Sequence, residues 1–169
     1  MLLSGEADIG IATEALAQYA DLVALPCYRW THSVIVPPNH PLLDGPLSLE
    51  KLARYPLITY GAGFTGRGHI DQAFAKHRIE PRIVLSAMDA DVIKTYVELG
   101  MGVGIVASIA FEAERDTQLR AIDAGALFGI NLTKLALRRG SYLRAYVYAL
   151  IESFAPTLQR SVVDQAMVA

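Results

Sequence analysis

The most constraining feature of the sequence is a regular alternation of apolar and helical segments in the middle of the chain. Residues 57–60, 82–86 and 103–107 have the length and the β-branched content of buried strands. Between them, residues 66–77 and the segment that follows Asp89 have the pattern of helices. Alternating strands and helices are typical of an α/β fold, so we predict a mostly parallel sheet with helices packed on it.

Further elements are predicted on both sides of this region. Additional strands are expected at residues 7–12, 22–26, 33–36, 119–122 and 132–137. Additional helices are expected at residues 48–54, with Ser48 as the N-cap, and at 108–114, 143–154 and 158–167. The helix at 143–154 has the clearest i, i+3, i+4 spacing of apolar side chains.

Composition excludes several classes of protein. The chain has 169 residues, of which 53% are hydrophobic and 19% charged, so intrinsic disorder is excluded. A net charge of −2 argues against a free-standing nucleic-acid binder. Uncharged runs such as residues 99–111 are too short to cross a bilayer, so no membrane association is expected. The single cysteine, Cys27, allows no internal disulfide and fits a reducing cytoplasm, which is the predicted location.

The first eight residues have the pattern of a helix end. Residues 1–8 resemble the last turn of a helix, a glycine cap at Gly5 and a turn into a strand. A helix of three residues is not stable alone. We therefore expect the chain to be the C-terminal part of a longer protein, although a frayed natural start remains an alternative.

A glycine-rich segment between the predicted strand 57–60 and the following helix is the most informative motif. Its residues 61–68, Gly-Ala-Gly-Phe-Thr-Gly-Arg-Gly, match the G-x-G-x-x-G pattern of dinucleotide sites. The pattern alone is weak, and Asp89 is only a loose candidate for the acidic residue that binds ribose. A nucleotide-dependent enzyme that uses Gly61 to Gly66 is one alternative.

The same segment also has the features of an anion site. Thr65 occupies the expected N-cap position of the helix, and Gly66 leaves the amides of the first turn uncovered. Arg67 adds positive charge at the positive end of the helix dipole, which is unfavourable unless an anion lies there. A plain glycine turn, with Thr65 as an ordinary cap and Arg67 in solvent, explains the residues equally well.

Thr13 is a second candidate ligand residue. It closes the predicted strand 7–12, and ligands of open α/β sheets bind outside the carboxyl ends of strands. Thr13 and Thr65 are therefore predicted to face one cleft, although Thr13 alone is more typical of a turn. Tyr28 and Trp30 are candidates to line that cleft, with core packing as the alternative for each.

No catalytic or metal-binding constellation is found. The four histidines have no i, i+4 spacing and no accompanying carboxylate or cysteine cluster, so no metal is expected. No G-x-S-x-G motif occurs, and Cys27 has no local sign of activation. Asp89 and Asp91 are explained by the start of a helix. We predict neither a catalytic residue nor a cofactor, and hence that the chain is not an enzyme.

Several segments together resemble the effector-binding domain of LysR-type transcriptional regulators, and more narrowly its CysB group. These segments are residues 5–14, 25–28, 40–42, Tyr60, 63–67, 89–97, 100–104, 133–134 and 138–139. They span nearly the whole chain. The Ala-Thr-Glu of residues 12–14, the Phe-Thr-Gly-Arg of 64–67 and the Asp-Ala-Asp-Val-Ile-Lys-Thr-Tyr of 89–96 are specific to that group.

This resemblance implies a fold like that of type II periplasmic binding proteins, with a small ligand between two α/β subdomains. Residues 1–27 and 132–169 would form an incomplete subdomain I, and residues 28–131 would form subdomain II. A solute-binding protein of the same fold is an alternative.

The resemblance also implies partners. CysB-like regulators are tetrameric activators of sulfur-assimilation genes that respond to O-acetylserine or N-acetylserine and to sulfate or thiosulfate. The anion site of the group uses threonines at positions matching Thr13 and Thr65. We predict that these two hydroxyls, with the Gly66 and Arg67 amides, hold the anion. DNA would be bound through a winged helix-turn-helix that this sequence does not contain. Met88 stands where a threonine is expected, which leaves the choice of ligand open.

Overall fold

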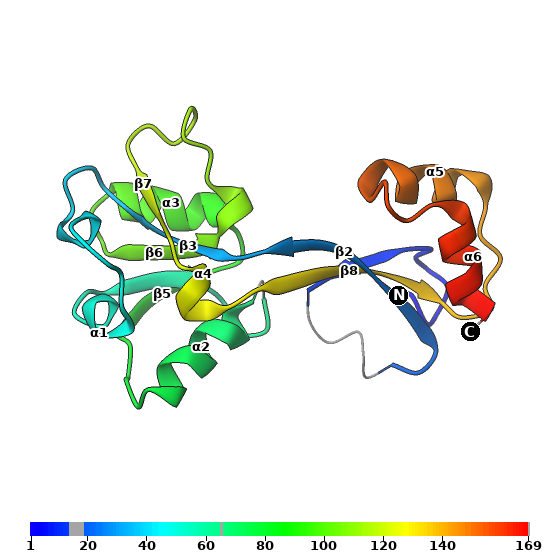
Figure 1. The fold of residues 1–169 in the computed structure, drawn as a ribbon, viewed down its shortest axis with the longest axis horizontal. Coiled ribbons are helices and arrows are strands. Elements are labelled where there is room, and N and C mark those ends of the chain that lie inside the picture. The colour runs from blue at the N-terminus through cyan, green and yellow to red at the C-terminus, as the bar shows by residue number, and fades with distance from the viewer. Residues whose placement is uncertain (14–18, 65, 169) are drawn as a thin grey trace. The chain divides into compact units, whose positions relative to one another are not determined.

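Two sheets organise the chain, one in each of two units (Figure 1). The computed structural model describes residues 1–13, 19–64 and 66–168. Trp30–Asn131 form one unit, here named the central unit. Met1–Arg29 and Leu132–Ala169 form the other, here named the terminal unit.

The sheet of the central unit is mixed. Its five strands have the order β5-β4-β6-β3-β7. They are β3 (His32–Val36), β4 (Leu57–Tyr60), β5 (Ile83–Ala87), β6 (Val103–Ala107) and β7 (Arg120–Asp123). β4 pairs in parallel with β5 and β6, whereas β3 is antiparallel to both β6 and β7. The prediction of a mostly parallel sheet is therefore wrong for one half of it, because β3 enters between β6 and β7 in the opposite direction.

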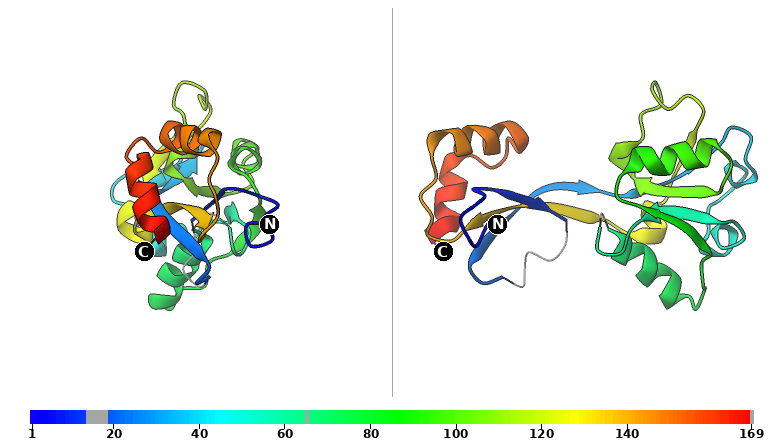
Figure 2. Two further views of the ribbon diagram at one scale, coloured as in Figure 1. Left: turned by 90° about the vertical axis from the view of Figure 1, so that its right-hand side faces the viewer. Right: turned by 180° about the vertical axis from the view of Figure 1, so that it is seen from behind.

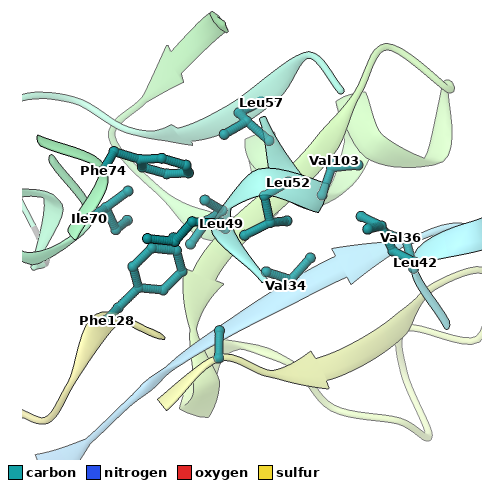
Figure 3. Packing of buried hydrophobic residues seen from close by; sticks show 12 residues of the cluster. Val34, Val36, Leu42, Leu49, Leu52, Leu57, Ile70, Phe74, Val103 and Phe128 are labelled. Carbon is teal, nitrogen blue, oxygen red and sulfur yellow. The ribbon is translucent and has the colours of Figure 1, made fainter. Parts of the chain in front are cut away.

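Helices cover both faces of this sheet. The residues of β3 alternate, so that Val34 and Val36 pack on one face and Ile35 on the other, as the two-residue period of a strand requires. The first face packs on helices α1 (Leu49–Leu52), α2 (Arg67–Lys76) and α4 (Gly125–Phe128), as Figure 3 shows. The second face packs on α3 (Ala90–Glu98). Burial of apolar side chains on two faces is the main stabilising term for this unit.

Two predicted helix caps are confirmed and one predicted helix is wrong. The Ser48 hydroxyl accepts a hydrogen bond from the Lys51 amide at 3.3 Å, and the Asp89 carboxylate accepts one from the Val92 amide at 2.9 Å. Residues 108–114 were expected to be helical, yet only Ser108–Ala110 form a 3-10 helix. The chain then forms a loop, because the Asp116 carboxylate accepts a hydrogen bond from the Glu112 amide at 2.9 Å.

The terminal unit has a three-stranded sheet with the order β1-β8-β2. Its strands are β1 (Gly10–Ala12), β2 (Leu22–Trp30) and β8 (Asn131–Arg138), and β1 runs antiparallel to β8. β2 continues past Pro26, where the sequence predicted its end. Proline is tolerated there because β2 lies at an edge of its sheet.

Two helices pack on this smaller sheet. They are α5 (Ala145–Phe154) and α6 (Arg160–Val168), and both chain ends lie in this unit (Figure 2). Val147 and Ile151 of α5 and Val163 of α6 are buried with Leu135 and Leu137 of β8. Among the helices that the structure describes, none is long and apolar enough to span a bilayer.

Candidate functional site

The carboxyl ends of three strands meet at one edge of the central sheet. β4, β5 and β6 run in parallel, so the residues that follow them share this edge. These residues are Gly61 after β4, Met88 and Asp89 after β5, and Ser108 after β6. Ligands of open α/β sheets bind at such an edge, which makes it the candidate site of this unit.

The segment Gly61–Gly66, here named the glycine turn, connects β4 to α2 at this edge. Gly63 and Gly66 have positive φ angles of 83° and 69°, which a side chain disfavours. The Phe64 amide donates to the Gly61 carbonyl at 3.2 Å, and the Gly61 amide donates to the Ala87 carbonyl at 2.9 Å. These bonds anchor the turn to the strands beneath it.

The predicted N-cap of α2 is wrong. The helix begins at Arg67, and Gly66 is its N-cap, with no capping bond from a side chain. Gly66 takes this position because the chain turns there through a left-handed conformation, which glycine adopts without steric cost. Thr65 itself lies outside the described residues, so its role as a ligand residue stays a prediction.

Arg67 already has partners within the protein. Its guanidinium donates to the Asp71 carboxylate at 2.8 Å and to the Tyr60 carbonyl at 2.6 Å, and lies 3.4 Å from the Ser86 hydroxyl. Its backbone amide donates to the Phe64 carbonyl at 2.9 Å. The side chain is only 13% exposed, so it is not the solvated cation of the plain-turn alternative. It connects α2 to the ends of β4 and β5.

Two buried polar side chains lie against Gly66. A Cβ atom added to Gly66 would collide with the Asn131 carboxamide oxygen and would lie 2.8 Å from Cε1 of His32. Asn131 and His32 are buried, and Asn131 Nδ2 lies 3.4 Å from Nδ1 of His32. Neither residue is predicted from the sequence, because no local signal marks a pair that lies 99 positions apart.

The remaining candidate residues lie in different surroundings. Thr13 follows β1 directly, at the end of the predicted strand, and is half-buried. Tyr28 is 43% exposed, and its ring packs edge-on against Phe154 in the terminal unit, with 5.2 Å between centroids. Trp30, at the end of β2, is buried, and its ring packs edge-on against His32, with 5.1 Å between the ring centroids. That Thr13, Tyr28 and Trp30 share one ligand stays a prediction.

Among the residues that the structure describes, no group of three or more His, Cys, Asp or Glu side chains is placed to hold a metal ion. Asp89 caps α3, which accounts for it without a ribose ligand. Burial raises the pKa of the Cys27 thiol, against a smaller lowering by the Leu135 backbone, so its reactive thiolate form is disfavoured.

Comparison with known proteins identifies the family. A sequence model of the LysR substrate binding domain matches residues 1–159. The chain belongs to this family. It is 55% identical over 168 residues to the HTH-type transcriptional regulator CysB of Burkholderia cenocepacia, covering 99% of the chain and 54% of that protein. It is 56% identical over 162 residues to the regulator SsuR of the same organism, covering 95% of the chain and 53% of SsuR.

A solved structure supports the same relationship. The cofactor-binding domain of the Cbl transcriptional regulator matches with a TM-score of 0.92 and 46% identity, over 99% of this chain and 75% of that one. This LysR domain therefore has the mixed α/β, two-sheet fold of the periplasmic-binding-protein type. The chain spans about half the length of the two curated relatives above. These relatives are transcriptional regulators rather than enzymes, in agreement with the prediction.

Proposed function

We propose that this LysR domain is the effector-sensing part of a CysB-like regulator of sulfur-assimilation genes. The single observation that carries the proposal is 55% identity to CysB across 99% of the chain. At this level of identity the two chains share their fold. The effector is a small anion such as sulfate or thiosulfate, or the inducers O-acetylserine and N-acetylserine.

The glycine turn supports an anionic ligand. It lies at the carboxyl edge of the central sheet and ends at the N-terminus of α2, where the helix dipole favours negative charge. The proposed ligand residues are Thr13, Thr65, Gly66 and Arg67, with Tyr28 and Trp30 lining the site. Because the Arg67 amide and guanidinium already have protein partners, we assign Arg67 mainly to holding the turn.

The domain assignment and the wider partners belong to the same proposal. Residues 1–27 with 132–169, and residues 28–131, act as two subdomains that close on the effector. The whole regulator acts in the cytoplasm as a homotetramer that binds DNA through a winged helix-turn-helix. Closure on the effector changes the geometry of that assembly on DNA.

A thermal-shift titration tests the proposal. Sulfate, thiosulfate, O-acetylserine and N-acetylserine are compared with NAD at matched ionic strength. A ligand at one hundred times its Kd stabilises the folded state by about 2.7 kcal/mol, which raises the Tm by about 5–10 °C for a chain of this size.

Two threonine variants locate the site. Thr65→Ala should abolish the rise in Tm with a sulfur ligand, whereas the exposed Thr117→Ala should leave it unchanged. A rise with NAD alone, or a sulfate effect that survives Thr65→Ala, would contradict the proposal.

A further inference from the structure

We propose that Asn131 is a positioning residue for the effector, which acts through Gly66 and is itself oriented by His32. The inference rests on the proposed function, because it concerns the glycine turn to which the anion is assigned. Neither residue is among those predicted to contact the ligand. Three sets of contacts carry the argument.

The first is the fit between Gly66 and Asn131. Gly66 has a φ of 69°, and the space that its Cβ would occupy is taken by the Asn131 carboxamide oxygen. Cε1 of His32 lies only 2.8 Å from the same point. The backbone of Gly66 is therefore seated on two side chains, and a shift of either one displaces the N-cap of α2.

The second is the orientation of the Asn131 amide. Its Nδ2 can only donate, so Nδ1 of His32, 3.4 Å away, accepts this hydrogen bond. This bond directs the carboxamide oxygen toward Gly66. His32 is fully buried, and its ring packs edge-on against the rings of Trp30 and Phe128, at centroid distances of 5.1 and 5.6 Å. Close packing keeps the ring in one place, and the ring in turn holds the amide.

The third is the path from Gly66 to the ligand. The Arg67 amide, in the first turn of α2, is fixed by its hydrogen bond to the Phe64 carbonyl. Gly66 lies between these two residues in sequence, so its position sets where α2 begins, and the N-terminus of α2 is the proposed anion site. Asn131 is also the first residue of β8 and His32 the first of β3. The turn is thereby tied to both strands by which the chain enters and leaves the central unit.

The test measures sulfate affinity by calorimetry and the hydrogen exchange of single amides by NMR. In Asn131→Ala we expect the sulfate Kd to rise about tenfold, a change in binding free energy that corresponds to roughly one hydrogen bond. Without any ligand, the Arg67 amide should exchange faster. The Gly61 amide, bonded to the Ala87 carbonyl, should keep its exchange rate and so show that the sheet remains paired.

Two glycines of one turn provide a matched control. Gly63 and Gly66 both have positive φ, but a Cβ on Gly63 meets no atom within 4 Å. Gly66→Ala should therefore weaken sulfate binding more than Gly63→Ala does. The effect of Gly66→Ala should shrink in the Asn131→Ala background, because the colliding oxygen is gone, while that of Gly63→Ala should not change.

The outcomes separate the two proposals. If the wild-type chain binds no sulfur ligand but Asn131→Ala still speeds exchange of the Arg67 amide, the proposed function fails and the positioning role stands. If Asn131→Ala leaves both the Kd and that exchange rate unchanged, the positioning role is refuted. Asn131→Ser, which keeps a small polar group, replaces Asn131→Ala if the latter does not fold. The sulfate Kd and the exchange rate of the Arg67 amide in that variant then decide in the same way.

Discussion

The buried ion pair between Lys94 and Asp116 provides the sharpest test of the packing in the central unit. The Lys94 ammonium lies 2.9 Å from the Asp116 carboxylate, and both side chains are only 8% exposed. Lys94→Met keeps the length of the side chain but leaves the carboxylate buried without its cation. Removal of one partner of a buried pair costs about 3–5 kcal/mol. We expect about 3 kcal/mol, the low end of this range, because the Arg115 cation still favours the charged form of Asp116 after Lys94 is replaced.

Urea denaturation followed by tryptophan fluorescence measures this cost. Trp30 is the single tryptophan and lies buried in the central unit, so its emission reports the unfolding of that unit. With an m-value of about 2 kcal/mol per molar urea, a loss of 3 kcal/mol lowers the midpoint by about 1.5 M. The control is Arg115→Met, which removes an exposed cation from the loop that carries Asp116. For this variant we expect a loss of stability below about 0.5 kcal/mol.

The pH dependence of the same variant gives an independent check. Burial alone would raise the pKa of Asp116, but the Glu112 amide and the Lys94 ammonium together hold that pKa below its ordinary value. The carboxylate therefore stabilises the folded chain above its ordinary pKa, and this stability is lost as the pH falls through the lowered pKa. The cost of Lys94→Met should be greatest near neutral pH and shrink below about pH 4. Equal costs for Lys94→Met and Arg115→Met at pH 7 would refute the reasoning.

Two further predictions concern local structure. Asp89→Ala removes the side-chain cap of α3 and should destabilise the chain by about 1 kcal/mol in thermal denaturation; an unchanged Tm would show that the cap is not needed. Gly104→Ala places a Cβ 2.5 Å from Cγ1 of Ile35 and 2.9 Å from Cγ2 of Val97, and overpacking of this kind should cost about 2 kcal/mol in urea denaturation. A variant as stable as the wild type would mean that β6 and α3 can separate freely.

The elements that sequence predicted best are those whose signals are local. The strands at 57–60 and 103–107 have the bounds that the apolar pattern indicates. Asp89 and Ser48 cap helices as expected, because a capping bond involves residues only three positions apart. Predictions failed where distant contacts override the local preference. The segment 108–114 is mostly loop because the Asp116 carboxylate accepts a hydrogen bond from the Glu112 amide. The ion pair between Asp116 and Lys94 connects this loop to α3.

The candidate site divides in the same way. Its glycine turn is visible in the sequence because the glycines, the preceding strand and the following helix are contiguous. The surroundings of Arg67 are not visible, because its partners Tyr60 and Ser86 come from two different strands. The threonine expected to cap α2 gives way to Gly66, since the left-handed turn at that position is a property of the folded path of the chain.

The sequence by itself determined most of the strand and helix segments, the place of the glycine turn and the resemblance to a family. Each of these depends on short patterns of residue types. Only the tertiary structure decided that β3 runs against its neighbours and that His32 and Asn131 meet under Gly66. Such contacts depend on the order in which strands pair, and strand order is determined by the packing of the whole unit rather than by any one segment.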